Sequence, residues 1–111
     1  MPTLDVSTLL KDMLGAAKNS LGNKWPKVKD LATNSFKKLS QVLVDIETMK
    51  LAGTISNEQA SLMLDMEKNT FKIVMLSVEI LGILAVEDAL NAALKVVKQT
   101  VNTAVGFALV A

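Results

Sequence analysis

The side chains that could do acid–base or covalent chemistry in this sequence are carboxylates, lysines, serines and threonines. The chain contains no cysteine and no histidine, so thiolate nucleophiles, imidazole bases and the usual ligands of zinc, copper and haem are missing. The eleven acids are scattered along predicted helices, and the Glu-x-x-His motif of di-iron bundles cannot form without histidine. All five glycines are isolated, which excludes a glycine-rich phosphate loop. We therefore expect a protein that is not an enzyme and that has no cofactor and no metal.

The charge balance argues against nucleic acid as a specific partner. Twelve basic residues, all of them lysine, stand against eleven acids and leave a net charge of +1. Without arginine the chain lacks the planar donor fork that recognises phosphates and guanine edges. The first residues, MPTLDVSTLLKD, lack the basic region of a secretory signal and carry an acid at Asp5. A cytoplasmic location is the default expectation.

The apolar content is high for a single small domain. Half of the 111 residues are hydrophobic, 21% are charged, and the mean hydropathy is +0.37. A chain of this length forms one domain, spanning residues 1–111, and small domains have a large surface relative to their volume. Some of this apolar surface should therefore meet a protein or lipid partner.

Apolar residues recur at helical spacing through most of the chain and predict an all-α fold. Pro26 suits the first turn of a helix, and Ser56 with Gln59 has the form of a capping box. No proline follows Pro26, so the third helix can run on, with a kink expected between Gly82 and Asp88. The predicted helices span residues 3–21, 26–52 and 57–108.

Within the long third helix, apolar residues recur at alternating steps of four and three. This spacing is typical of the packing seam of a coiled coil, and it continues for longer than a globular helix requires. It indicates that the protein self-associates through this helix. The predicted seam comprises Leu62, Met66, Asn69, Ile73, Leu76, Ile80, Ile83, Glu87, Leu90, Leu94, Val97, Val101, Ala104 and Ala108.

Two polar residues interrupt the seam. A buried Asn69 would pair with its symmetry mate and specify the register and oligomer number, whereas at the edge of an intramolecular bundle it would simply be hydrated. A buried Glu87 would need a partner, and the candidates are lysines on another helix or water at a kink. Both alternatives stay open for each residue.

The segment IVMLSVEILGILAV, residues 73–86, is uncharged except for Glu79. A membrane span needs about 20 apolar residues, and an acid at its centre costs roughly 2.5–3.5 kcal/mol. Because Glu87 and Asp88 end the stretch, we favour a buried helix over a span. Glu79 is in line with Asp65 and Lys72, and we expect these three residues to lie opposite the seam.

A group of lysines around one tryptophan precedes the middle of the second helix. It could bind anionic lipid headgroups, with the indole at the membrane interface, or it could be a solvated helix face that opposes aggregation. The group comprises Lys24, Trp25, Lys27, Lys29, Lys37 and Lys38.

The sequence therefore predicts an all-α helical bundle in which two amphipathic helices pack on one long C-terminal helix, completed by homo-oligomerisation. The expected function is structural or interaction-based, and the expected partner is a second copy of the chain. One alternative is a membrane-active protein whose soluble form docks on or inserts into lipid. A weaker alternative is a binder of an apolar small ligand in the bundle core, where six methionines could adapt to it.

Overall fold

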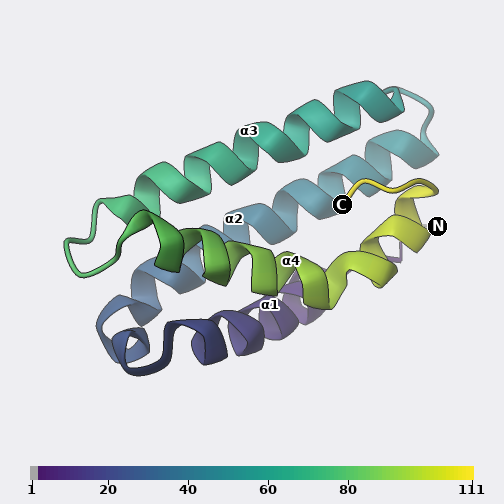
Figure 1. Ribbon diagram of the computed structural model, residues 1–111. Coiled ribbons are helices and arrows are strands. Elements are labelled where there is room, and N and C mark those ends of the chain that lie inside the picture. Colours follow the sequence, from purple (N-terminus) through teal and green to yellow (C-terminus); the bar gives the residue numbers. More distant parts are fainter. Residues whose placement is uncertain (1–2) are drawn as a thin grey trace.

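Four α-helices and one short 3-10 turn build residues 3–111, the part of the chain that the computed structural model describes (Figure 1). No strand occurs in these residues, which confirms the predicted all-α class. The elements are α1 Val6–Leu21, η1 Gly22–Lys24, α2 Trp25–Leu51, α3 Asn57–Leu76 and α4 Ile83–Val105.

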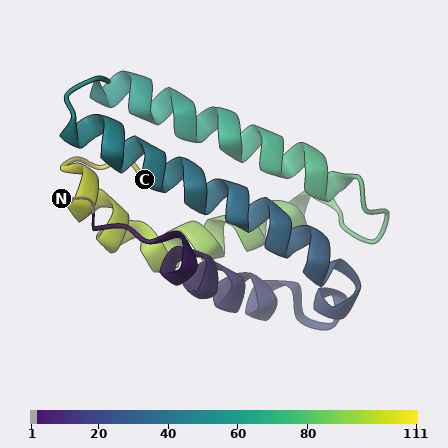
Figure 2. The same cartoon turned by 180° about the vertical axis from the view of Figure 1, so that it is seen from behind.

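The helices run alternately up and down along a bundle of 42 × 22 × 20 Å (Figures 1 and 2). The α1–α2 and α3–α4 connections lie at one end of the bundle, and the α2–α3 connection lies at the other (Figures 1 and 2). α1 packs mainly on α4, and α2 packs mainly on α3, whereas α3 and α4 meet less extensively. The tail after α4 turns back beside α3.

Local capping sets the helix ends. Asp5 accepts hydrogen bonds from the Thr8 amide at 3.0 Å and from its hydroxyl at 2.9 Å, so α1 begins at Val6 rather than at residue 3. The predicted capping box before α3 is confirmed: Ser56 and Gln59 exchange hydrogen bonds of 2.8 and 3.1 Å. α4 ends at Gly106, whose φ of 82° suits glycine.

The single long helix predicted over residues 57–108 is wrong, because the chain reverses between α3 and α4. The break covers residues 77–82, starting ahead of the predicted kink at Gly82 to Asp88. Ser77 donates its hydroxyl to the Val74 carbonyl at 2.6 Å, and further turns follow before α4 starts. An unbroken helix would be a rod of about 80 Å, far longer than α2 could cover, whereas folding back buries one face of α4 against α1.

All four helices contribute to one apolar core. At its centre the rings of Phe36 and Phe71 lie 4.6 Å apart between centroids, with their planes tilted by 50°. α1 contributes Leu9, Met13 and Ala17, and Leu81 from the α3–α4 connection is also buried. The buried residues of α4 are Val86, Ala89, Leu90, Ala93, Leu94, Val97, Val101 and Val105.

Candidate functional site

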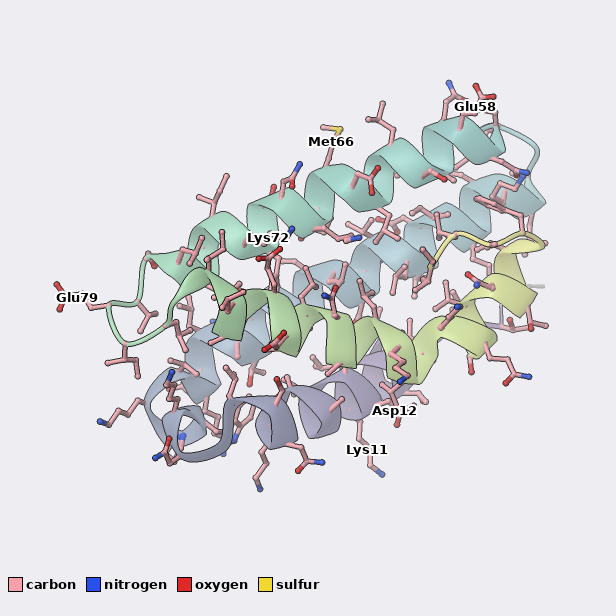
Figure 3. All side chains as sticks on the ribbon, in the orientation of Figure 1. Lys11, Asp12, Glu58, Met66, Lys72 and Glu79 are labelled. Atoms are coloured by element: carbon pink, nitrogen blue, oxygen red, sulfur yellow. The ribbon has the colours of Figure 1, made fainter. Side chains whose placement is uncertain are left out.

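α3 carries a row of large apolar side chains that point away from the bundle. Leu62 is 59% exposed, Met66 60%, Ile73 73% and Leu76 38%, and Asn69 stands exposed in the middle of the row. At about 100° per residue these five positions lie within about 80° of one another around the helix. Figure 3 shows Met66 projecting outward from α3, away from the core. We call Leu62, Met66, Asn69, Ile73 and Leu76 the α3 stripe.

The opposite face of α3 is also apolar, and it faces inward. Ala60, Leu64, Phe71 and Met75 are at most 3% exposed and pack in the core. α3 is therefore hydrophobic on two opposite faces, of which the fold buries one. Such a helix is typical of the interior of an assembly or of contact with another apolar surface.

The predicted position of Glu79, Asp65 and Lys72 opposite the seam is wrong, because the core occupies that side of α3. Asp65 and Lys72 instead border the α3 stripe along one edge, about 60° to 80° around the helix from Leu62. Glu79 lies beyond the end of α3, in the connection to α4, where its side chain points away from the bundle (Figure 3). The acid is thus solvated at an end of the molecule.

The predicted seam is divided between two different surfaces. Before the break its residues are exposed, and Ile80 at 39% and Ile83 at 57% continue the apolar surface past the end of α3. After the break the same spacing serves the core of the monomer, because α4 packs on α1. The seam residues buried there are Leu90, Leu94, Val97 and Val101, while Ala104 is half-buried and Ala108 lies exposed in the tail. The spacing thus identified an apolar face on α4, but this face packs on α1 of the same chain, so the predicted role of these residues in the oligomer seam is wrong.

Glu87 lies near a lysine of another helix, one of the two environments that the sequence left open. Its Oε2 is 3.8 Å from Nζ of Lys72, so the pair bridges α3 and α4. Both side chains remain about a third exposed, and such pairs contribute less than about 1 kcal/mol. Lys72 is therefore free to change partners at little cost.

The lysine group around Trp25 does not form one patch. Trp25 is 9% exposed and belongs to the core, so the structure contradicts the alternative in which its indole lies at the membrane interface. Lys24 belongs to η1 and is half-buried, whereas Lys27 and Lys29 are exposed on α2, about 160° apart around the helix. Lys27 is near the α1–α2 end of the bundle, whereas Lys37 and Lys38 lie further along α2.

One buried carboxylate, Glu47, escaped the sequence reasoning. It is 1% exposed and accepts hydrogen bonds from the Thr3 amide at 2.8 Å, the Thr3 hydroxyl at 2.7 Å and the Leu4 amide at 2.8 Å. Burial acts to raise the pKa of Glu47, but these donors outweigh burial and hold the pKa below its ordinary value. Because its acceptor sites are occupied by the chain itself, Glu47 fastens residues 3 and 4 to α2. Its spacing of four from the buried Leu43 was the available signal.

Glu67, on α3, is perturbed in the opposite direction. It lies half-buried beside a groove between α2 and α3, where burial raises its pKa and the charge of Lys38 opposes the rise. The groove is about 210 Å³. A single half-buried acid with one lysine nearby lacks the convergent groups of a catalytic site.

Two of the larger surface grooves are lined partly by α4. One, of about 650 Å³, is lined by Thr3, Glu47 and residues of α4 such as Gln99 and Thr103. The other, of about 490 Å³, lies between α3, α4 and the tail, which is held there because Asn102 exchanges two hydrogen bonds with the backbone of Val110 at 2.8 and 2.9 Å. Both linings mix polar and apolar groups.

Residues 3–111 contain neither a cluster of metal-ligating side chains nor a helix that could span a membrane. In residues 3–111, no three acidic side chains gather as metal ligands would. None of the helices α1 to α4 combines the length and the apolarity that a membrane crossing requires. No protein-family model, curated protein or solved structure matches the chain.

Proposed function

We propose that the protein is a non-enzymatic interaction protein that assembles with copies of itself through the α3 stripe. The observation that carries the proposal is the exposure of four large apolar side chains in register along one helix face. Isolated exposed leucines are ordinary, but several large apolar side chains grouped on one exposed helix face are typical of a protein–protein contact. A second copy offers the same row and can cover it.

The energetics favour a weak assembly. Fully burying one Leu, Ile or Met side chain is worth about 1.5–3 kcal/mol, and the α3 stripe offers four that are partly exposed. From Leu62 to Leu76 the row is only about 21 Å long. Against this stands the cost of association, which is at least about 4 kcal/mol. We therefore expect a dimer that forms at micromolar or higher concentration and dissociates on dilution.

Sedimentation velocity over a concentration series tests this proposal. Wild-type protein should shift from monomer toward a discrete oligomer as its concentration rises, whereas Ile73→Lys should stay monomeric because it places a charge in the contact. Val96→Lys is the matched control, since Val96 is also more than half exposed but lies on α4 outside the stripe. A wild-type monomer at every concentration, or equal effects of the two substitutions, would contradict the proposal.

A second candidate function, docking on an anionic lipid surface, is supported by the apolar side chains at one end of the bundle. Ile80, Ile83 and Leu84 are exposed there, and the α1–α2 connection with Lys24, followed by Lys27 in the first turn of α2, lies at the same end (Figures 1 and 2). Burying these apolar groups in the interfacial region while lysines meet headgroups is the usual mode of such docking.

The acid at that same end, Glu79, opposes docking on anionic lipid, so we rank this candidate below self-assembly. Flotation with anionic and with neutral vesicles tests it. Docking predicts co-flotation with anionic vesicles alone, lost in Leu84→Glu and strengthened in Glu79→Gln. Protein that stays at the bottom of the gradient in both lipids would exclude it.

A further inference from the structure

We propose that two copies pair antiparallel, α3 against α3, about a two-fold axis at Asn69, with Asp65 of each copy beside Lys72 of the other. This inference rests on the proposed self-assembly through the α3 stripe and adds the orientation and register of the contact. The juxtaposition that carries it is the position of the two charges on one edge of the stripe, on either side of Asn69.

The apolar part of the stripe is compatible with this axis. Leu62 and Leu76 each lie seven residues from Asn69, and Met66 and Ile73 lie three and four residues from it. An antiparallel pair centred on Asn69 therefore sets Leu62 against the second copy's Leu76 and Met66 against its Ile73. The two Asn69 amides meet on the axis, where each can donate to and accept from the other.

The charged edge distinguishes antiparallel from parallel pairing. In an antiparallel pair the two-fold axis is perpendicular to both helices, so each edge of the stripe meets the same edge of the second copy in reverse direction. Along α3, Asp65 lies about 6 Å from Asn69 toward the N-terminus and Lys72 about 4.5 Å from it toward the C-terminus. In the antiparallel pair, Asp65 of one copy and Lys72 of the other are therefore offset by only about 1.5 Å along the helix direction. Two reciprocal ion pairs then lie along one edge of the apolar row, one on either side of the two-fold axis.

A parallel pair has no such complementarity. Its axis runs along the helices, so the edge with Asp65 and Lys72 would meet the other edge of the second copy, which carries Gln59, Met63 and Thr70. None of these three residues is charged, and both ions would lose water without gaining a partner. Lys72 can turn from Glu87 to Asp65 of the second copy at little cost, because its contact with Glu87 is long and partly exposed.

Disulfide cross-linking of single-cysteine variants tests the orientation, and the absence of native cysteine gives a clean background. A disulfide needs Cα atoms within about 7 Å. In the antiparallel pair, the cysteines of two Asn69→Cys copies lie close enough to form a disulfide. Two Leu62→Cys copies do not cross-link, because their cysteines are about 21 Å apart along the helix direction. Leu76→Cys alone also fails, whereas a mixture of the Leu62→Cys and Leu76→Cys proteins forms the mixed dimer. Val96→Cys, exposed on α4, measures random collision.

The outcomes separate this inference from the function on which it rests. Self-linking of Leu62→Cys and Leu76→Cys, each alone, indicates a parallel pair and overturns the antiparallel register while leaving self-assembly intact. Cross-linking of every stripe variant, and of the mixture, only at the Val96→Cys level overturns both. All of these positions are exposed, so the substitutions leave the core unchanged.

Charge reversal tests the proposed ion pairs in the unmodified stripe. Asp65→Lys and Lys72→Asp should each weaken the dimer by roughly three- to thirtyfold, because each creates two like-charge contacts. The double variant Asp65→Lys with Lys72→Asp should return the dissociation constant to near the wild-type value, since opposite charges face one another again. Additive weakening in the double variant, measured by sedimentation, would overturn the register.

Discussion

Glu47 allows a direct test of one stabilising contact, because its carboxylate binds residues 3 and 4 to α2. Glu47→Ala removes the acceptor for the amides of Thr3 and Leu4 and for the Thr3 hydroxyl. Leu4 is 8% exposed, so its unpaired amide costs about 1–3 kcal/mol. The Thr3 groups lie nearer the surface and can turn to water, and their two bonds are worth about 0.5–1.5 kcal/mol each.

Glu47→Ala should therefore lower the free energy of unfolding by about 2–6 kcal/mol, which corresponds to a fall of roughly 10–25 °C in melting temperature. Urea unfolding followed by circular dichroism measures the change. Asp45→Asn is the matched control, because Asp45 lies on the same helix but is exposed, and it should change stability by less than about 0.5 kcal/mol. A loss below about 1 kcal/mol for Glu47→Ala would refute the fastening role.

The same contacts predict a pH dependence with a definite sign. The pKa of Glu47 is held below its ordinary value of 4.5, so the folded state favours the charged carboxylate. The stabilisation is fully present above that ordinary value and is lost as the pH falls through the lower pKa of the folded protein. In Glu47→Gln this component disappears, so the difference in stability between wild type and variant should shrink on acidification. A difference that stays constant or grows would contradict the assignment.

Three further substitutions test other parts of the structure. Asn102→Ala breaks both hydrogen bonds to Val110, and it should cost about 1–2 kcal/mol and speed hydrogen exchange after Gly106. Phe71→Ala removes the ring packed on Phe36 and should cost about 3–5 kcal/mol in urea unfolding. Glu67→Gln should raise the melting temperature slightly at neutral pH and lose that advantage on acidification through the raised pKa of Glu67, because burial disfavours its charge.

Periodicity and capping signals predicted most of the helices. The ends of α2 differ from the prediction by one residue, and the capping box at Ser56 marks the start of α3 as expected. The reversal at residues 77–82 could not be predicted in the same way. Apart from Gly82, its residues have ordinary helix propensities and none is proline, so local sequence does not mark a break. The turn exists because α4 gains a covered face on α1, which is a tertiary effect that local sequence does not encode.

The apolar spacing identified which residues share a face but not which surface that face meets. Leu62 and Leu94 belong to the same repeat, yet one is 59% exposed and the other 4%. The repeat does not reveal a chain reversal, because two helices joined by a turn can keep the same spacing of four and three residues between apolar positions. Trp25 and Glu47 are also buried, because their positions on α2 place them on its core-facing side.

The packing of a single subunit does not explain why the exposed α3 stripe is apolar, as the orientation of α3 shows. Turning the helix half a turn would bury the α3 stripe, but it would bring Asn69 inside and expose Phe71, which packs on Phe36. The observed orientation gains the aromatic contact and holds Glu67 half-buried with a raised pKa, an unfavourable arrangement. It also leaves Leu62, Met66, Ile73 and Leu76 exposed to water, at positions where polar residues would not lower the stability of the bundle. A row with no use in the single subunit is what a contact between subunits requires, and this supports the proposed self-assembly.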